Sequence, residues 1–283
     1  MSIEVKELTH IYSEGLPHES VALENVSFRA EDGKLVGIIG HTGSGKSTLV
    51  QHLNGLLKPK SGTILVGDVD ITADGVSMRE IRRKIGLVFQ YPEYQLFEET
   101  VARDVAFGPT NLGLAQQEID RRVKEAIEMV VLDYHQIKNL SPFDLSGGQK
   151  RRVAIAGVIA MKPQVLILDE PTAGLNPKAH GDILNMVETI HRRESNIVFL
   201  VSHNMNDIAR MSDQILVMDH GRLVMDGTPA EVFSREEELK SMGLALPDSM
   251  EIVSRLRKAG MHIDGTCLTI EEAAEKIAEG LKR

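Results

Sequence analysis

Short runs of apolar and β-branched residues alternate with turn residues through the first ninety positions of the chain. These runs are typical of strands and lie at residues 3–5, 21–29, 35–39, 63–66 and 85–89. Helical spacing of apolar residues occurs there once, directly after Gly45. The pattern therefore predicts a mixed sheet with a single helix in this part of the chain.

Apolar residues then recur three or four positions apart from Thr100 to about Leu132, which indicates a small helical insert. Two continuous apolar runs follow, at residues 165–168 and 197–201. Such runs are typical of parallel strands that are buried on both faces, and helical patterns follow each of them, from about Pro177 and Met205.

A hairpin of residues 215–218 and 223–225 closes this part of the sequence, and helical patterns resume at about Pro229. Pro247 is placed to begin one helix, and Thr269 is placed to cap another ahead of Glu272. The elements predict an α/β fold: a mixed sheet core with an antiparallel β part, a helical part at about 92–160, and a small helical C-terminal domain.

Length and charge limit the possible functions. The 283 residues suffice for one large domain and an appendage, which we divide at 1–230 and 231–283. The formal charge of −9 argues against a general nucleic-acid binder, which needs clustered Lys and Arg. Cys267 is the one cysteine and is expected to be a structural thiol in a reduced compartment. Neither a signal peptide nor an apolar run of ~20 residues is present, so we expect any membrane function to require a partner.

Residues 40–47 read Gly-His-Thr-Gly-Ser-Gly-Lys-Ser, between a predicted strand and a predicted helix. In this context the glycines let backbone N–H groups converge on phosphate oxygens at a helix N-terminus, while Lys46 adds a positive charge. Ser47 offers a hydroxyl to Mg²⁺. The residues expected to bind the nucleotide are Gly40, Thr42, Gly43, Ser44, Gly45, Lys46, Ser47 and Thr48.

Two carboxylates, Asp169 and Glu170, end the apolar run that begins at Val165. The carboxyl edge of a parallel sheet brings such residues beside the phosphate loop. Asp169 is then a candidate Mg²⁺ ligand, and Glu170 is a candidate general base for the attacking water. Glu170 favours hydrolysis over binding alone.

Residues 145–151 read Leu-Ser-Gly-Gly-Gln-Lys-Arg, and here the chain resembles the ATP-binding-cassette (ABC) ATPase family. Ser146, Gly147, Gly148 and Gln149 match the family signature, a second helix start that accepts phosphate. In this family the signature of one chain and the phosphate loop of another grip one nucleotide. The resemblance therefore implies a head-to-tail dimer that binds two ATP molecules with Mg²⁺.

Other landmarks of the family follow in order over residues 1–230. Gln90 matches the glutamine that senses Mg²⁺ and the attacking water, and His203 matches the switch histidine at the γ-phosphate. Tyr12 resembles the aromatic residue that stacks on adenine, although it could be a plain packing residue. Asn176 occupies the position where the family usually has Asp. This departure implies altered communication between the two nucleotide sites. It also implies that the partner is a paralogous ATPase, so that the dimer is a heterodimer.

Residues 90–101 and 104–109 resemble the energy-coupling factor (ECF) transporters, which include cobalt and nickel importers. The loop 13–20 and the tail from Gly243 favour the second ATPase of the ECF pair, whose C-terminal part contacts the other ATPase. Glu93, Glu98 and Glu99 are expected to form an acidic docking groove for an arginine-bearing helix of a membrane subunit, with a solvated acidic turn as the alternative.

The resemblance implies a peripheral subunit at the cytoplasmic face of the cell membrane. Its partners would be a second ATPase, a transmembrane coupling protein and a substrate-binding membrane protein, and hydrolysis would drive uptake of vitamins or transition-metal ions. The alternative is an ABC ATPase of a soluble assembly, for iron–sulfur scaffolds, DNA repair or translation. Such relatives usually carry a long coiled-coil insert, a second cassette or a basic surface, and none is visible in this sequence.

Overall fold

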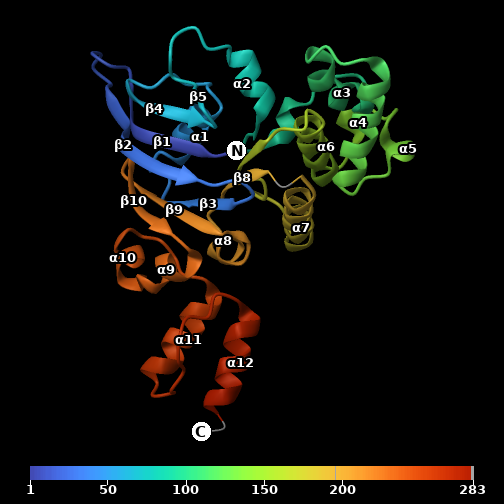
Figure 1. Ribbon diagram of the computed structural model, residues 1–283. Helices are drawn as coiled ribbons and strands as arrows, with labels where there is room; N and C mark the ends of the chain where they lie inside the picture. The colour runs from blue at the N-terminus through green and yellow to red at the C-terminus, as the bar shows by residue number, and fades with distance from the viewer. Residues whose placement is uncertain (195, 282–283) are drawn as a thin grey trace.

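The computed structural model describes residues 1–194 and 196–281, which form two sheets with helices around them (Figure 1). The smaller, antiparallel sheet has the order β2 (Ser20–Ala30), β1 (Ile3–Tyr12), β4 (Ser61–Val66) and β5 (Val69–Asp70). The larger sheet has the order β10 (Arg222–Gly227), β9 (Gln214–Asp219), β3 (Leu35–Ile39), β8 (Ile197–Val201), β7 (Val165–Asp169) and β6 (Ile85–Val88). The predicted α/β class is confirmed.

In the larger sheet, β3, β8, β7 and β6 run parallel, and every residue of these four strands is buried. This burial explains why they read as continuous apolar runs. Only β10 is antiparallel to its neighbour. Because the carboxyl ends of the parallel strands meet at one edge, the segments that follow β3, β6, β7 and β8 converge there.

The expectation of a single helix before Gln90 is wrong, because α2 (Met78–Lys84) follows α1 (Lys46–Leu53). Only Ile81 of α2 is buried, so the helix has no apolar stripe that could have revealed it. β1 and β2 are also longer than predicted. The residues that extend β1 mix exposed positions such as Lys6 and Glu7 with the buried Leu8, as in an antiparallel sheet with one solvated face, so no continuous apolar run marks them.

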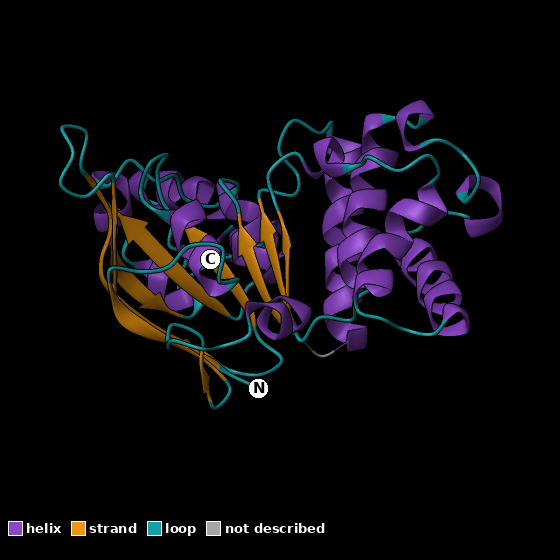
Figure 2. Cartoon of the chain, turned by 90° about the horizontal axis from the view of Figure 1, so that it is seen from above, coloured by secondary structure: helices purple, strands orange, loops and turns teal. Residues whose placement is uncertain are grey.

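Figure 2 shows a group of helices to one side of the sheets. This group consists of α3 (Val101–Asn111), α4 (Gln116–Met129), α5 (Tyr134–Ile137) and α6 (Gly147–Ile159), with short 3-10 helices at Pro92–Gln95 and Pro142–Asp144. Two further helices, α7 (Pro177–Glu194) and α8 (Met205–Met211), follow β7 and β8.

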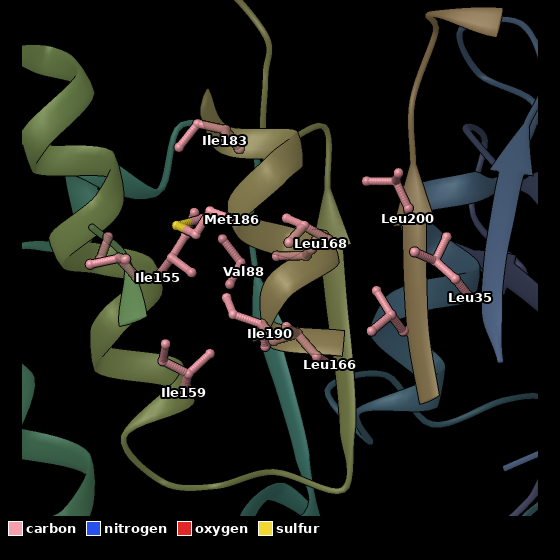
Figure 3. Close-up of a cluster of buried hydrophobic side chains, with 14 of the residues drawn as sticks. Leu35, Val88, Ile155, Ile159, Leu166, Leu168, Ile183, Met186, Ile190 and Leu200 are labelled. Carbon is pink, nitrogen blue, oxygen red and sulfur yellow. The ribbon is translucent and has the colours of Figure 1, made fainter. Parts of the chain in front are cut away.

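α6 and α7 join the helical group to the sheet through one hydrophobic core (Figure 3). Ile155 and Ile159 of α6 face Met186 and Ile190 of α7, and both pairs lie against strand residues such as Leu166. All five side chains are buried. Close packing of this kind couples the second half of α6 to α7 and the sheet, because a displacement of one element has to be accommodated by the others.

The C-terminal helices are α9 (Pro229–Ser234), α10 (Glu236–Ser241), α11 (Asp248–Lys258) and α12 (Ile270–Gly280). The large core extends as far as Leu246 and Met250. A separate small cluster then contains Val253 and Cys267. The division at 231 therefore stays a prediction, since the large core continues past it as far as α11. Among the described residues, none of the helices is both long and apolar enough to cross a membrane.

Candidate active site

The loop between β3 and α1 is a tight backbone cradle in which two glycines cannot be replaced without strain. Gly40 and Gly45 have φ angles of 153° and 99°, a region that side-chain-bearing residues rarely adopt. A Cβ on Gly40 would lie 2.2 Å from the carbonyl oxygen of Met218, and one on Gly45 would lie 2.6 Å from that of Ala22. The loop therefore packs directly on β2 and on the end of β9.

Lys46 is the buried cation of this cradle. Its Nζ donates to the carbonyl oxygens of Gly40 at 2.7 Å and His41 at 2.9 Å. Burial lowers the pKa of Lys46, while the charges of Glu170 and Asp169 act in the opposite direction. An anion bound in the loop would restore the favourable electrostatics that burial has removed, which suits the cradle to phosphate.

Ser44 adds a second polar group to the loop. Its hydroxyl is fully buried and has no hydrogen-bond partner within the described residues. Unsatisfied buried hydroxyls are costly, so their presence indicates a ligand or a conformational change that satisfies them.

Asp169 and Glu170 leave β7 in different directions. Asp169 is buried, and burial raises its pKa even though a hydrogen bond from Ser47 and the charge of Lys46 lower it. Glu170 has a φ of 51°, and its carboxylate lies 2.5 Å from Nε2 of His203. Nε2 of Gln90 donates to the second oxygen of that carboxylate at 3.2 Å. Three strand ends thus supply Glu170, His203 and Gln90 to one spot.

Glu170, His203 and Gln90 line a cavity of about 420 Å³, whereas Gly40, Ser44 and Asp169 do not. The predicted residues that line it are Tyr12, Thr42, Gly43, Gly45, Lys46, Ser47, Thr48, Gln90, Glu170 and His203. The hydroxyl of Tyr12 lies 3.3 Å from Oγ1 of Thr48, which places the ring beside the start of α1. The cavity is also lined by Ser20, Val21 and Ala22, which sequence reasoning missed. No local motif marks them, because only the pairing of β2 with β1 brings them there.

The signature residues lie elsewhere, since among the described residues that line this cavity none comes from 146–149. Ser146 caps α6: its hydroxyl accepts from the N–H of Gln149 at 3.4 Å, and Oε1 of Gln149 accepts from the N–H of Ser146 at 3.0 Å. A Cβ on Gly147 or Gly148 would meet open space. These glycines are not required by packing within the chain, so the bare helix start is free to approach another molecule.

Arg151 of α6 connects this helix to the segment after β6, which contains Glu93, and to the segment after β7, which contains Pro171. Its guanidinium donates to Glu93 at 2.8 and 3.0 Å, and to the carbonyl oxygens of Pro171 at 3.1 Å and Ala173 at 2.7 Å. The expectation that Glu93 belongs to a docking groove is therefore wrong, because both of its carboxylate oxygens face this internal arginine. Arg151 itself is 2% exposed.

A groove does exist between α2 and the helical group, with a volume of about 690 Å³. Its lining includes Leu96, Phe97 and Phe107, and the two phenylalanine rings meet edge to face at 4.9 Å. The expected acidic character is wrong, because three arginines of α2 line it: Arg79, Arg82 and Arg83. Glu98 and Glu99 instead form ion pairs with Arg103.

Asn176 lies at the start of α7, where its Oδ1 accepts from the N–H of Ala179 at 2.9 Å. This is the contact that an Asp at the same position would make, because Asn and Asp cap helices comparably. The substitution of the family's Asp therefore removes a charge without removing the helix cap.

The comparisons with known proteins agree with this geometry. The family model for ABC transporters matches residues 23–173. The chain is 55% identical over 278 residues to "Energy-coupling factor transporter ATP-binding protein EcfA2" of Clostridioides difficile, covering 98% of this chain and 96% of the relative. Among solved structures it resembles cbiO1 of Clostridium perfringens, part of the ABC transporter complex cbiONQ, with a TM-score of 0.75 and 36% identity over 90% of this chain and 98% of that one.

A second solved structure is a dimer of the ATP-binding cassette MJ0796 bound to ADP and Pi. Its TM-score is 0.71 and its identity 29%, over 80% of this chain and 98% of that one. The chain therefore belongs to the ABC transporter ATPases, in the group of energy-coupling factor transporter ATP-binding proteins, and is an ATP-hydrolysing enzyme of that family.

Proposed function

We propose that this chain is one of two cassettes that hydrolyse ATP to drive uptake through a membrane coupling subunit, with Glu170 as the general base. The observation that carries the proposal is the contact of Glu170 with His203 and Gln90 in the wall of the phosphate cavity. A carboxylate held there by two side chains is placed to accept a proton from a water molecule that attacks the γ-phosphate.

The phosphate loop fits a nucleotide triphosphate. Lys46 and the backbone N–H groups of the loop would bind the phosphate oxygens, and Tyr12 would stack on the base. The neighbouring Ser47 and Asp169, with Gln90, offer the oxygen ligands that Mg²⁺ prefers, and we propose that they hold this ion. When bound, the ion neutralises charge on the phosphate oxygens.

A second cassette would complete each site. Ser146 and the open glycines of α6 do not face this chain's own phosphate cavity, so we propose that they close on the nucleotide of the other cassette. The dimeric MJ0796 structure with ADP and Pi supports such an arrangement. Asn176, in place of the family's Asp, supports a paralogous partner and hence a heterodimer.

We further propose that the groove between α2 and the helical group receives an amphipathic helix of the transmembrane coupling protein. Its apolar floor, exposed at Phe97 and Phe107, fits the apolar face of such a helix. The chain would then sit at the cytoplasmic face of the membrane, with a substrate-binding membrane protein in the same complex, and the cargo would be a vitamin or a transition-metal ion. The relatives are transporter proteins, which favours this function over the soluble assemblies.

Glu170→Gln tests the catalytic part of this proposal. The variant should bind ATP and accumulate as a closed dimer in size-exclusion chromatography, while phosphate release falls at least ~100-fold because the water loses its proton acceptor. Glu128→Gln, which alters an exposed residue of α4 away from the phosphate cavity, is the control and should keep normal turnover. Normal turnover in Glu170→Gln would refute the role of Glu170.

Copurification in mild detergent tests the membrane part. Tagged wild-type chain should recover a second cassette, a transmembrane coupling protein and small substrate-binding membrane proteins. Replacing Phe97 and Phe107 by Ser should abolish recovery of the membrane proteins without changing ATP binding, whereas Val131→Asn, at an exposed apolar residue outside the groove, should not. Recovery of soluble partners alone would contradict the transport function.

A further inference from the structure

A cluster of two histidines and an aspartate lies beside the phosphate loop and has no part in the proposed hydrolysis. His41 belongs to the loop, Asp219 ends β9, and His220 lies in the turn to β10. One potential ligand atom of each residue lies within 4.8 Å of those of the other two. None of the three lines the phosphate cavity, so the cluster is separate from the nucleotide site.

Backbone contacts hold this cluster together. His220 and Gly221 have φ angles of 43° and 79°, as a two-residue hairpin turn with two left-handed positions requires. The N–H of Gly221 donates to the carbonyl oxygen of Ser44 at 3.1 Å, which attaches the turn to the phosphate loop. The rings of His41 and His220 consequently lie 4.8 Å apart, centre to centre.

The hydrogen bonds of His41 call for a cation at its second nitrogen. Nδ1 lies 2.8 Å from the carbonyl oxygen of Thr42, which can only accept, so Nδ1 carries the hydrogen. Nε2 lies 3.0 Å from Oδ1 of Asp219, and an ionised carboxylate also only accepts. A lone pair on Nε2 would face the carboxylate unfavourably unless a proton or a metal ion lay between them.

The separations are within a few tenths of an ångström of those around a small transition-metal ion. Ligand atoms at about 2.0–2.2 Å from a tetrahedral ion lie roughly 3.2–3.6 Å from one another. The distance from Asp219 Oδ1 is 3.0 Å to Nε2 of His41 and 3.9 Å to Nε2 of His220. The side chain of His220 is 84% exposed and so can rotate to close the remaining gap. The bond from Nδ1 of His41 to Thr42 is the outer contact that typically orients a histidine ligand.

We propose that His41, Asp219 and His220 form a binding site for a first-row transition-metal ion such as Zn²⁺, with one position open to water. Two imidazoles and one carboxylate favour such ions over Mg²⁺, which takes mainly oxygen ligands. The ion would link the phosphate loop to the β9–β10 hairpin. This ion would be distinct from the Mg²⁺ that Ser47 and Asp169 are proposed to hold with ATP.

Calorimetric titration of the nucleotide-free full chain with ZnCl₂, in excess MgCl₂, tests the site. One Zn²⁺ should bind per chain, and His220→Gln and Asp219→Asn should each weaken binding at least ~10-fold, because each removes a ligand. His262→Gln is the matched control: its exposed imidazole lies 3.5 Å from Asp264, outside the cluster, and the variant should bind as the wild type does.

The metal-free thermal midpoints of His220→Gln and Asp219→Asn decide whether lost binding reflects a lost ligand or a damaged fold. A wild-type midpoint together with weakened Zn²⁺ binding in either variant supports the site. Wild-type affinity and stoichiometry in His220→Gln would overturn the proposal, as would absence of Zn²⁺ binding to the wild type or its loss in excess Mg²⁺.

Discussion

The ion pair between Arg151 and Glu93 gives the strongest stability prediction, and Arg151→Met is the perturbation. Methionine keeps much of the buried aliphatic volume but removes the guanidinium. The change leaves the Glu93 carboxylate, 18% exposed, and the carbonyl oxygens of Pro171 and Ala173 without their donor. Removing one member of a buried ion pair costs about 3–5 kcal/mol, and we expect a loss near the lower end of this range because the Glu93 carboxylate that is left unpaired keeps some access to solvent.

A loss of this size should lower the thermal midpoint by roughly 10 °C, taking about 2–4 °C per kcal/mol for a domain of this size. Circular dichroism on heating and urea unfolding would measure it. Arg192→Met is the control, because this residue pairs with Glu188 while 76% exposed, and such pairs contribute about 0.5 kcal/mol or less. A loss below about 1 kcal/mol in Arg151→Met would refute the reasoning.

The difference in the free energy of unfolding between the wild type and Arg151→Met should depend on pH, because Glu93 titrates. Burial would raise its pKa, but the hydrogen bonds and charge of Arg151 bring the pKa below the ordinary value of 4.5. A carboxylate with a lowered folded-state pKa stabilises the fold above its unfolded-state pKa and loses that effect as the pH falls through the folded value. In Arg151→Met the lowering by the guanidinium is lost while burial still raises the pKa of Glu93, so the deficit of the variant in the free energy of unfolding should shrink as the pH falls from 7 towards 4.

Three further predictions concern the nucleotide site. Tyr12→Ala should weaken ATP binding about 10-fold if the ring stacks on the base, whereas Tyr12→Phe should not. If fluorescence titration gives Tyr12→Ala the same affinity for ATP as the wild type, Tyr12 is a packing residue. Asn176→Ala should lower stability by about 1 kcal/mol through loss of the α7 cap, and Asn176→Asp should not, which urea unfolding would test. Asp169→Asn should raise the melting temperature of the nucleotide-free chain at neutral pH. Burial raises the pKa of Asp169, so the ionised carboxylate destabilises the folded wild type above the unfolded-state pKa. The gain in melting temperature should vanish in acid, because the wild-type carboxyl is then protonated. A lower midpoint for Asp169→Asn at pH 7 would show that its contacts outweigh the burial.

The sequence was informative wherever one local pattern carries the physics. The phosphate loop requires glycines at fixed positions because of backbone angles and close approaches, and the buried strands β7 and β8 require apolar residues on both faces. Both requirements appear as patterns of consecutive residues in the sequence. The family and the fold class could therefore be predicted before any contact was known.

Only the tertiary structure decided which charges meet. Glu93 pairs with Arg151, which lies 58 positions away, and the arginines of α2 face a groove that had been expected to be acidic. His41 meets Asp219 across 178 positions through the packing of a hairpin on the loop. Long-range pairs of this kind depend on how separate elements are placed. The energy of an ion pair depends on the distance between its charges and on their burial, so neither the partners nor the energy can be predicted from the sequence alone.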